Sequence, residues 1–266
     1  MLSLPYLFWC AAFILIPLAM VFYYGFTDKT GAFTLENILA IATPEHFKAL
    51  RISILLSLIA TVVCLLLAYP LAMILARMEV NTHSFIVLIF ILPMWMNFLL
   101  RTMAWQTLLE KNGVINSVLS FLHLPSLNLI NTPGAIILGM VYNFLPFMVL
   151  PIYNSLTKID QNVINAARDL GANSVHTFFK ITLPLSLPGV ISGITMVFVP
   201  ALTTFVISTL LGGSKILLIG NVIEQEFTQT GNWHLGSGLS MVLMLFIIVN
   251  MVLSAIFYKE GEANAL

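Results

Sequence analysis

Six long apolar stretches recur along the chain, separated by shorter polar segments, and only one of them contains a charged residue. They extend from about Leu4 to Phe26, Ile52 to Ala76, Phe85 to Leu109, Ala135 to Leu156, Leu187 to Leu211 and Leu235 to Tyr258. Each reaches the roughly 20 residues that a helix needs to cross about 30 Å of hydrocarbon. Because lipid satisfies no backbone polar group, the pattern predicts an all-α integral membrane protein with six transmembrane helices.

The composition supports this class. Apolar residues make up 59% of the 266 positions and charged residues 8%, the mean hydropathy is +1.00, and the net charge is zero. A soluble domain carries about a quarter charged residues, and a neutral balance indicates no nucleic acid partner. Cys10 and Cys64 lie inside apolar stretches, so we interpret both as small buried hydrophobes, and we predict no metal site.

The amino-terminal stretch is too long for a removable signal peptide and lacks a small-residue cleavage site, so we expect it to remain in the protein. No lysine or arginine precedes Lys29, which leaves open that a basic leader is missing. The other basic residues are shared evenly between the two sets of loops. The positive-inside count therefore does not decide the orientation.

The polar segment between the fourth and fifth stretches has a pattern of its own. Asp160 is placed to cap a helix whose apolar residues Val163, Ala167 and Leu170 recur at spacings of four and three. Gly171 follows where such a helix needs a residue with left-handed backbone in order to end. The pattern predicts a short amphipathic helix closed by glycine.

A second short helix is predicted from Ser174 to Thr182, and Pro184 and Pro188 are expected to restart the chain into the membrane. The two short helices would form an elbow whose alanines let another protein's backbone come close. Two interpretations remain open at this point. The elbow either receives a partner protein or is an ordinary amphipathic loop segment that lies at the lipid headgroups and packs on its own protein.

The elbow contains Asn165-Ala166-Ala167, then Gly171, then Ile181-Thr182-Leu183-Pro184. This segment resembles the EAA loop of type I ATP-binding-cassette (ABC) importer permeases, whose pattern is Glu-Ala-Ala, three residues, Gly and an apolar helix ending in Ile-x-Leu-Pro. In that family the loop docks as a coupling helix into an ATPase subunit on the cytoplasmic face. The resemblance assigns this role to Asn165, Ala166, Ala167, Arg168, Asp169, Leu170, Gly171 and Ala172.

One position departs from that pattern. Asn165 replaces the family's glutamate, which puts any ion pair of that glutamate with the ATPase in question here. An amide still donates and accepts hydrogen bonds, so docking need not fail.

Three further segments resemble the PotB type of spermidine/putrescine permease. They are Pro93 to Asn97 with Arg101, Leu145 to Ser155, and Gly212 to Ile223. The resemblance implies a subunit that moves polyamines across the bacterial cytoplasmic (cell) membrane, in the type I (MetI-like) importer permease fold with both termini cytoplasmic. A permease of the same fold for another small solute is the alternative.

The same resemblance divides the chain into three parts. Residues 1–48 hold the first transmembrane helix and an external loop, residues 49–258 form the ABC transmembrane type-1 domain with the EAA coupling loop at 157–186, and residues 259–266 form a cytoplasmic tail.

The chain contains no G-x-x-x-x-G-K-[ST] phosphate loop, so we expect it to bind no cofactor and expect ATP and Mg in a partner ATPase. The resemblance implies a PotA-type ATPase dimer, a PotC-type sister permease and a PotD-type substrate-binding protein, besides membrane lipid. The loop from Gly212 to His234, with Lys215, Glu224 and Glu226, either faces that binding protein or is a solvated connection.

Polar and aromatic residues beside prolines indicate a substrate path. Trp95 and Asn97 follow one proline of the third stretch, and Tyr142 and Asn143 precede another in the fourth. Proline bends a helix, and transporter sites form at such bends. We hypothesise that these four side chains line the path, where an aromatic face attracts an amine cation by about 0.5–2 kcal/mol. The alternative is helix packing with an interfacial aromatic belt.

No aspartate or glutamate lies within any stretch, so selectivity for a cationic substrate is expected mainly in the binding protein. Arg101 has the wrong sign for such a path, and we expect a structural or interface role for it. An intramembrane enzyme is the rival class, but the histidines are scattered, no H-E-x-x-H motif exists, and Ser237 has only His234 nearby. A passive channel is a second rival, which would retain uptake without an ATPase.

Overall fold

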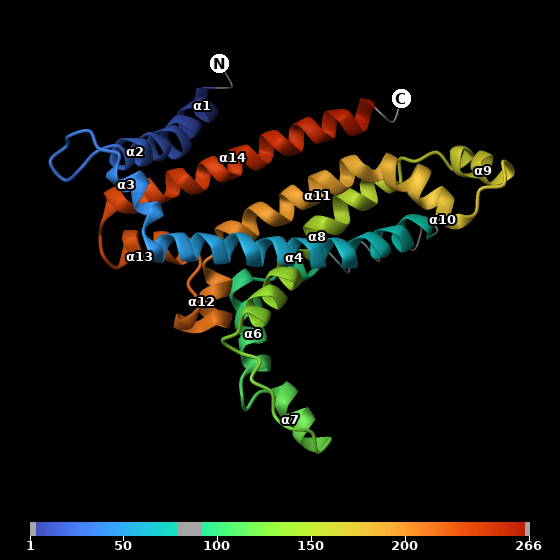
Figure 1. Ribbon diagram of the computed structural model, residues 1–266, viewed down its shortest axis with the longest axis horizontal. Coiled ribbons are helices and arrows are strands. Elements are labelled where there is room, and N and C mark those ends of the chain that lie inside the picture. The colour runs from blue at the N-terminus through green and yellow to red at the C-terminus, as the bar shows by residue number, and fades with distance from the viewer. Residues whose placement is uncertain (1–3, 79–91, 264–266) are drawn as a thin grey trace. The chain divides into compact units, whose positions relative to one another are not determined.

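The computed structural model describes residues 4–78 and 92–263, and within these ranges the regular elements are helices (Figure 1). The α-helices are α1 (Leu4–Cys10), α2 (Ile16–Gly25), α3 (Glu36–Leu39), α4 (Pro44–Arg77), α6 (Phe98–Leu109), α7 (Val114–Phe121), α8 (Pro133–Leu156), α9 (Gln161–Asp169), α10 (Ser174–Thr177), α11 (Leu183–Thr203), α12 (Val206–Gly212), α13 (Ile219–Thr228) and α14 (Trp233–Ala263). Two π-helical turns, Ala11–Leu15 and Phe178–Thr182, join α1 to α2 and α10 to α11. The predicted all-α class is confirmed.

Within the described ranges, five continuous helical segments are long and apolar enough to cross a membrane. They are Phe8–Gly25, Pro44–Arg77, Pro133–Leu156, Ser174–Thr203 and Trp233–Ile256. They correspond to the first, second, fourth, fifth and sixth predicted stretches. The third stretch lies partly outside the described residues, and its described part forms a short 3₁₀ turn (Leu92–Trp95) followed by α6.

The fifth stretch differs from the prediction at both ends. It was expected over Leu187 to Leu211, but α11 ends at Thr203, because Thr204 has extended backbone (ψ 138°) and α12 begins afresh after it. At the other end, the helix starting at Ser174 does not stop before Pro184. The π-helical turn directly precedes that proline, so its missing N–H falls where the regular hydrogen-bond ladder is already interrupted. The predicted restart at the prolines is therefore wrong.

The chain separates into two compact units. Unit 1 comprises the described residues up to Ser53 and Leu217–Val249. Its parts meet at the carbonyl oxygen of Thr27, which accepts from Asn37 Nδ2 (2.9 Å) and from His234 Nδ1 (2.6 Å). The Ser53 hydroxyl accepts from the backbone N–H of Ile219 at 2.8 Å, which ties the start of α4 to α13.

The loop after α2 is held by Asp28. The Thr30 hydroxyl donates to Asp28 Oδ1 at 2.7 Å, and the backbone N–H groups of Ala32 and Thr30 donate to the same oxygen. These hydrogen bonds favour the charged form and keep the pKa of Asp28 below its ordinary value.

Unit 2 comprises the described residues between Ile54 and Ile216 together with those from Asn250 onward. Its centre is the pair α8 and α11, which lie side by side (Figure 1). They approach closely because glycines of α11 face α8: a Cβ at Gly193 would lie 2.7 Å from Met148 Sδ, and one at Gly189 2.5 Å from the Pro151 carbonyl oxygen. Small residues at helix interfaces take this role in membranes, where the hydrophobic effect does not draw helices together.

Helix α4 supplies a second small-residue face in this unit. Ala60, Cys64, Ala68 and Ala72, spaced four apart, are each fully buried. Cys64 Sγ lies 3.9 Å from the carbonyl oxygen of Val141 on α8. The interpretation of Cys64 as a small buried hydrophobe is confirmed, whereas Cys10 is only half-buried in the described structure.

Gly189→Ala is expected to lower the thermal stability of the detergent-solubilised protein, because the new methyl group would lie 2.5 Å from both the Pro151 carbonyl oxygen and Ser155 Cβ. Overpacking of this kind costs about 1–3 kcal/mol. Gly134→Ala is the matched control, since its Cβ would meet nothing closer than the Thr132 hydroxyl at 3.7 Å. Thermal unfolding followed by size-exclusion chromatography measures both variants. Equal unfolding midpoints would contradict this account of the α8–α11 contact.

Candidate coupling site

Helix α9 forms the outer arm of the elbow and is held by its own caps. Asp160 is its N-cap residue, as predicted, and Oδ1 of its carboxylate accepts from the backbone N–H of Asn162 at 2.9 Å. None of the residues of α9 is buried. The helix is therefore stabilised locally and not by tertiary packing.

The carboxyl end of α9 closes in a Schellman motif. The N–H of Ala172 donates to the carbonyl oxygen of Ala167 (3.0 Å), and the N–H of Gly171 donates to that of Arg168 (2.9 Å). Gly171 has φ +85°, which confirms the predicted left-handed residue. A Cβ at Gly171 would meet nothing within 4 Å, so backbone conformation and not space requires glycine there.

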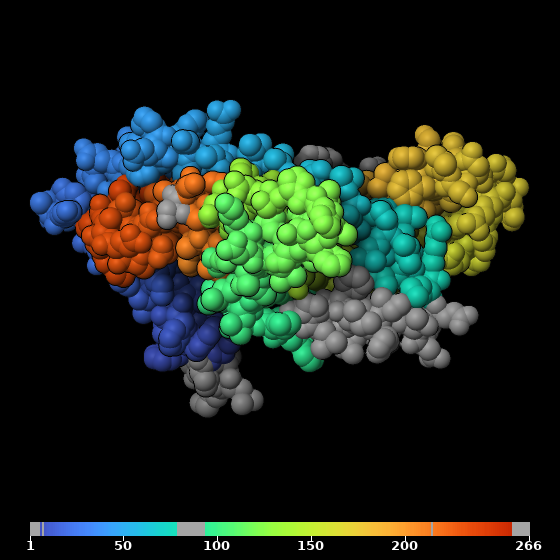
Figure 2. Space-filling view, turned by 90° about the horizontal axis from the view of Figure 1, so that it is seen from below, coloured from blue at the N-terminus to red at the C-terminus, as the bar shows by residue number. Residues whose placement is uncertain are grey.

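The apolar residues of α9 and its C-cap Leu170 are at most half-covered by the rest of the described structure. Leu170 is 89% exposed and Val163 45% exposed, while Ala166 is exposed and Ala167 half-buried. Figure 2 shows this segment, in yellow, as a lobe at one end of unit 2. The described part of the protein therefore does not cover the outer side of this stripe, which is available to a partner protein or to lipid headgroups.

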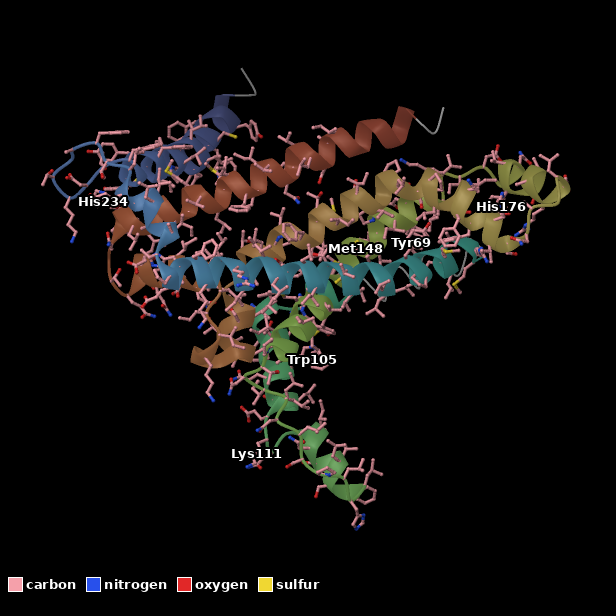
Figure 3. All side chains as sticks on the ribbon, viewed as in Figure 1. Tyr69, Trp105, Lys111, Met148, His176 and His234 are labelled. Carbon is pink, nitrogen blue, oxygen red and sulfur yellow. The ribbon has the colours of Figure 1, made fainter. Side chains whose placement is uncertain are left out.

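The inner arm of the elbow connects to the membrane-crossing helices. Oδ1 of Asn173 caps α10 by accepting from the backbone N–H of His176 at 2.8 Å. After α10, the ring of Phe178 packs edge-on against Tyr69 of α4, with the ring centroids 5.6 Å apart. The Tyr69 hydroxyl is hydrogen-bonded to Ser186 Oγ of α11 at 2.7 Å. Figure 3 labels Tyr69 and His176, which mark the two ends of this arm.

The sequence reasoning missed Tyr69 and Ser186. These two residues are 117 positions apart, and both side chains are buried. The only sequence signal was a pair of hydroxyl groups inside apolar stretches, where each needs a hydrogen-bond partner. Together they join the elbow to both α4 and α11.

The four residues predicted to line a substrate path lie in different surroundings. Trp95 is 77% exposed, and Asn97 is the N-cap of α6, with Oδ1 accepting from the backbone N–H of Leu99 at 2.9 Å. Tyr142 faces α6: its ring lies edge-on to Trp105 (centroids 5.3 Å apart), which Figure 3 labels. The Arg101 guanidinium lies 5.8 Å from the Tyr142 ring centroid, a cation–π distance.

Asn143, the neighbour of Tyr142, points into the protein and is 1% exposed. Its Nδ2 donates to the carbonyl oxygen of Gly139 in its own helix at 2.8 Å. Its Oδ1 has no hydrogen-bond partner among the described residues. The structure therefore places Tyr142 against α6, whereas the hydrogen bond of Asn143 stays within α8. The prediction that these residues line a path stays a prediction.

Arg101 and the segment from Gly212 to His234 were also singled out from the sequence. Arg101 is 7% exposed, in agreement with an interior position. The segment from Gly212 to His234 is not merely an irregular connection, because α13 occupies its centre. The carboxylates of Glu224 and Glu226 accept from the Thr228 and Thr230 hydroxyls, at 2.9 and 2.8 Å. No group of three or more histidine, cysteine, aspartate or glutamate residues in the described ranges has the geometry of a metal site.

Comparison with known proteins agrees with the family resemblance found in the sequence. Residues 1–259 match the family described as binding-protein-dependent transport system inner membrane component. The spermidine/putrescine transport system permease protein PotB of Haemophilus influenzae is 37% identical, over 91% of this chain and 88% of its own length. PotB of Escherichia coli K12 is 36% identical, over 96% of this chain and 97% of its own.

A solved structure shares the fold. It is that of a bacterial ABC transporter involved in the import of the acidic polysaccharide alginate, and the matching chain superposes with a TM-score of 0.78 at 16% identity. The match covers 97% of this chain and 94% of that one. The predicted permease class, in the MetI-like importer fold and without enzyme chemistry of its own, is confirmed by these relatives. The chain is a multi-pass membrane protein that belongs to the family of inner membrane components of binding-protein-dependent transport systems.

Proposed function

We propose that this chain is the permease subunit of an ABC importer that moves polyamines across the cytoplasmic membrane, while a separate subunit hydrolyses ATP with Mg. The observation that carries the coupling part is α9, a doubly capped helix with no buried residue and an exposed apolar stripe. The substrate class is supported by the two PotB proteins, which are named for spermidine and putrescine.

The elbow is the proposed docking point for a PotA-type ATPase dimer, through Asn165 to Ala172. In this arrangement the elbow faces the cytoplasm, and the six crossings predicted from the sequence would place both termini on that side as well. A PotC-type sister permease completes the membrane part, and a PotD-type binding protein delivers substrate from outside. This last partner is supported by the family description, which names dependence on a binding protein.

The contacts of the inner arm describe how a push on α9 would reach the membrane. The Schellman bonds hold α9 rigidly to the turn at Gly171, and Asn173 fixes the start of α10. From there the ring of Phe178 packs against the ring of Tyr69, whose hydroxyl is hydrogen-bonded to Ser186 Oγ. A displacement of the elbow would thus move α4 and α11 together.

For the substrate path, we propose Trp95, Asn97, Tyr142 and Asn143, with Asn143 as the most direct polar contact. Its buried Oδ1 is an acceptor without a partner among the described residues, and an ammonium group donates to such an oxygen. The aromatic ring of Tyr142 is adjacent in sequence, but Arg101 already lies near it. We therefore assign Arg101 a structural role.

The substrate class is tested with the complete transporter reconstituted in liposomes with its binding protein. We expect spermidine or putrescine to stimulate ATP turnover, because the loaded binding protein signals through the permease to the ATPase. An amino acid or sugar that stimulates turnover in place of both polyamines would favour the alternative, a permease of the same fold for another small solute.

Gly171→Val is expected to uncouple ATP turnover from uptake while the protein still inserts. A branched side chain in left-handed backbone costs about 1–2 kcal/mol, which would distort the Schellman turn. Gly231→Val is a matched control, because Gly231 also has positive φ (+66°) and open space around its Cβ but lies between α13 and α14. The ratio of polyamine taken up to ATP hydrolysed measures coupling. An unchanged ratio for Gly171→Val, or an equal loss for Gly231→Val, would count against the assignment.

Asn143→Leu is expected to reduce polyamine uptake without loss of folding stability. The substitution nearly conserves volume. It gives up the Nδ2 hydrogen bond to the Gly139 carbonyl oxygen but also removes a buried acceptor that is unsatisfied within the described structure, so the two effects on the free energy of unfolding offset each other. Asn250→Leu is the control, since Asn250 Oδ1 on α14 is likewise buried without a partner there. Uptake assays measure a role of Asn143 in the substrate path, and thermal unfolding measures a role in helix packing. Full uptake by Asn143→Leu would assign Asn143 to helix packing.

A further inference from the structure

A cavity of about 510 Å³ lies in unit 2, where the carboxyl end of α4 meets the two arms of the elbow. Arg77, the last residue of α4, and Arg168, in the last turn of α9, both line it. The side chains of Gln161 and Ser174 add an amide and a hydroxyl group to the lining, whereas the Thr177 hydroxyl donates to the carbonyl oxygen of Asn173 at 3.0 Å. The cavity therefore presents several hydrogen-bond donors around one space.

The charge of this cavity is unbalanced. No aspartate or glutamate is among its lining residues, and neither Arg77 nor Arg168 forms an ion pair with any described residue. A basic residue in the last turn of a helix interacts favourably with the helix dipole, which accounts for each arginine singly. It does not account for two guanidinium groups that line one cavity without an acidic partner among the described residues. An anion bound between them would balance the charge.

The lining favours a phosphate group over a single carboxylate. Guanidinium forks bind phosphate oxygens in pairs, and the Ser174 hydroxyl and the Gln161 amide supply further donors for the remaining oxygens. The same cavity also has apolar walls, including Met73, Val175 and Phe179, and the last two are 65% and 59% exposed. Apolar surface beside a dibasic cavity, at the end of a membrane-crossing helix, matches the chemistry of an anionic lipid.

We propose that this cavity binds the phosphate group of an anionic ligand, with Arg77 and Arg168 as its paired donors. Two sources carry that group, the headgroup of an anionic phospholipid and free inorganic phosphate. The apolar walls favour the phospholipid. Occupancy would link the end of α4 to α9, so the site lies beside the coupling elbow and shares Arg168 with the segment proposed to meet the ATPase.

The test uses the complete purified transporter in mixed micelles that contain neutral phosphatidylcholine and a titrated amount of phosphatidylglycerol. Native mass spectrometry measures the phosphatidylglycerol retained. Arg77→Gln is expected to weaken retention about fivefold, the effect of one basic residue at an anionic headgroup. Arg77→Lys should retain most of the binding. Lys158→Gln, which removes a charge from the lining of a different cavity beside α8, should leave retention unchanged.

A second arm adds millimolar inorganic phosphate. If phosphate displaces the phosphatidylglycerol and binds with the same dependence on Arg77, the phosphate site is supported and its ligand is free inorganic phosphate. Equal retention by Arg77→Gln and the unaltered protein would overturn the proposal, as would an equal loss in Lys158→Gln. A cross-link from Arg77→Cys to the ATPase, with no lipid retained, would also overturn it. Since the readout is lipid binding and not uptake, this proposal and the proposed transport function fail separately.

Discussion

Hydrocarbon offers no hydrogen-bond partner to a peptide group, and this constraint governs every described part of the chain that crosses the membrane. It explains why α4 continues for 34 residues and through Pro70. It also explains why α8 continues through Pro146 and Pro151. Departures from regular helix are short, as in the π-helical turn at Phe178–Thr182. This turn contains Phe178, through which the elbow contacts Tyr69 of α4.

The elbow follows a different rule, because its stability comes from its own ends. Asp160, the Schellman turn at Gly171 and Asn173 satisfy the free backbone groups of α9 and α10 without help from the membrane-crossing helices. A helix built in this way keeps its shape while its side chains stay exposed. That combination suits a surface that meets another protein, and it leaves Ala166 and Ala167 free for close approach.

Within unit 2 the helices are joined by a few polar contacts in addition to small residues. Tyr69 and Ser186 connect α4 to α11, and Thr195 Oγ1 donates to Ser254 Oγ of α14 at 2.8 Å. Such bonds contribute about 0.6 kcal/mol on average in membranes, so their value lies more in orientation than in stability. Asn143 is the contrasting case, since its buried oxygen orients nothing in the described structure.

The sequence by itself determined the membrane class and the existence of the five described crossings, and it located most of the ends of these crossings to within a few residues. It also determined both ends of α9 and, through the EAA resemblance, the permease family. These features depend on hydropathy summed over a stretch or on residues within about five positions, such as Asp160 with Asn162 and Ala167 with Ala172. Only the tertiary structure decided the break at Thr204, the continuation through Pro184, the Tyr69–Ser186 bond and the cavity shared by Arg77 and Arg168. The shared cavity and that bond depend on residues far apart in the chain, and the two helix boundaries depend on backbone conformation within the packed bundle. A local sequence pattern predicts neither contacts between distant residues nor helix boundaries that are set by packing.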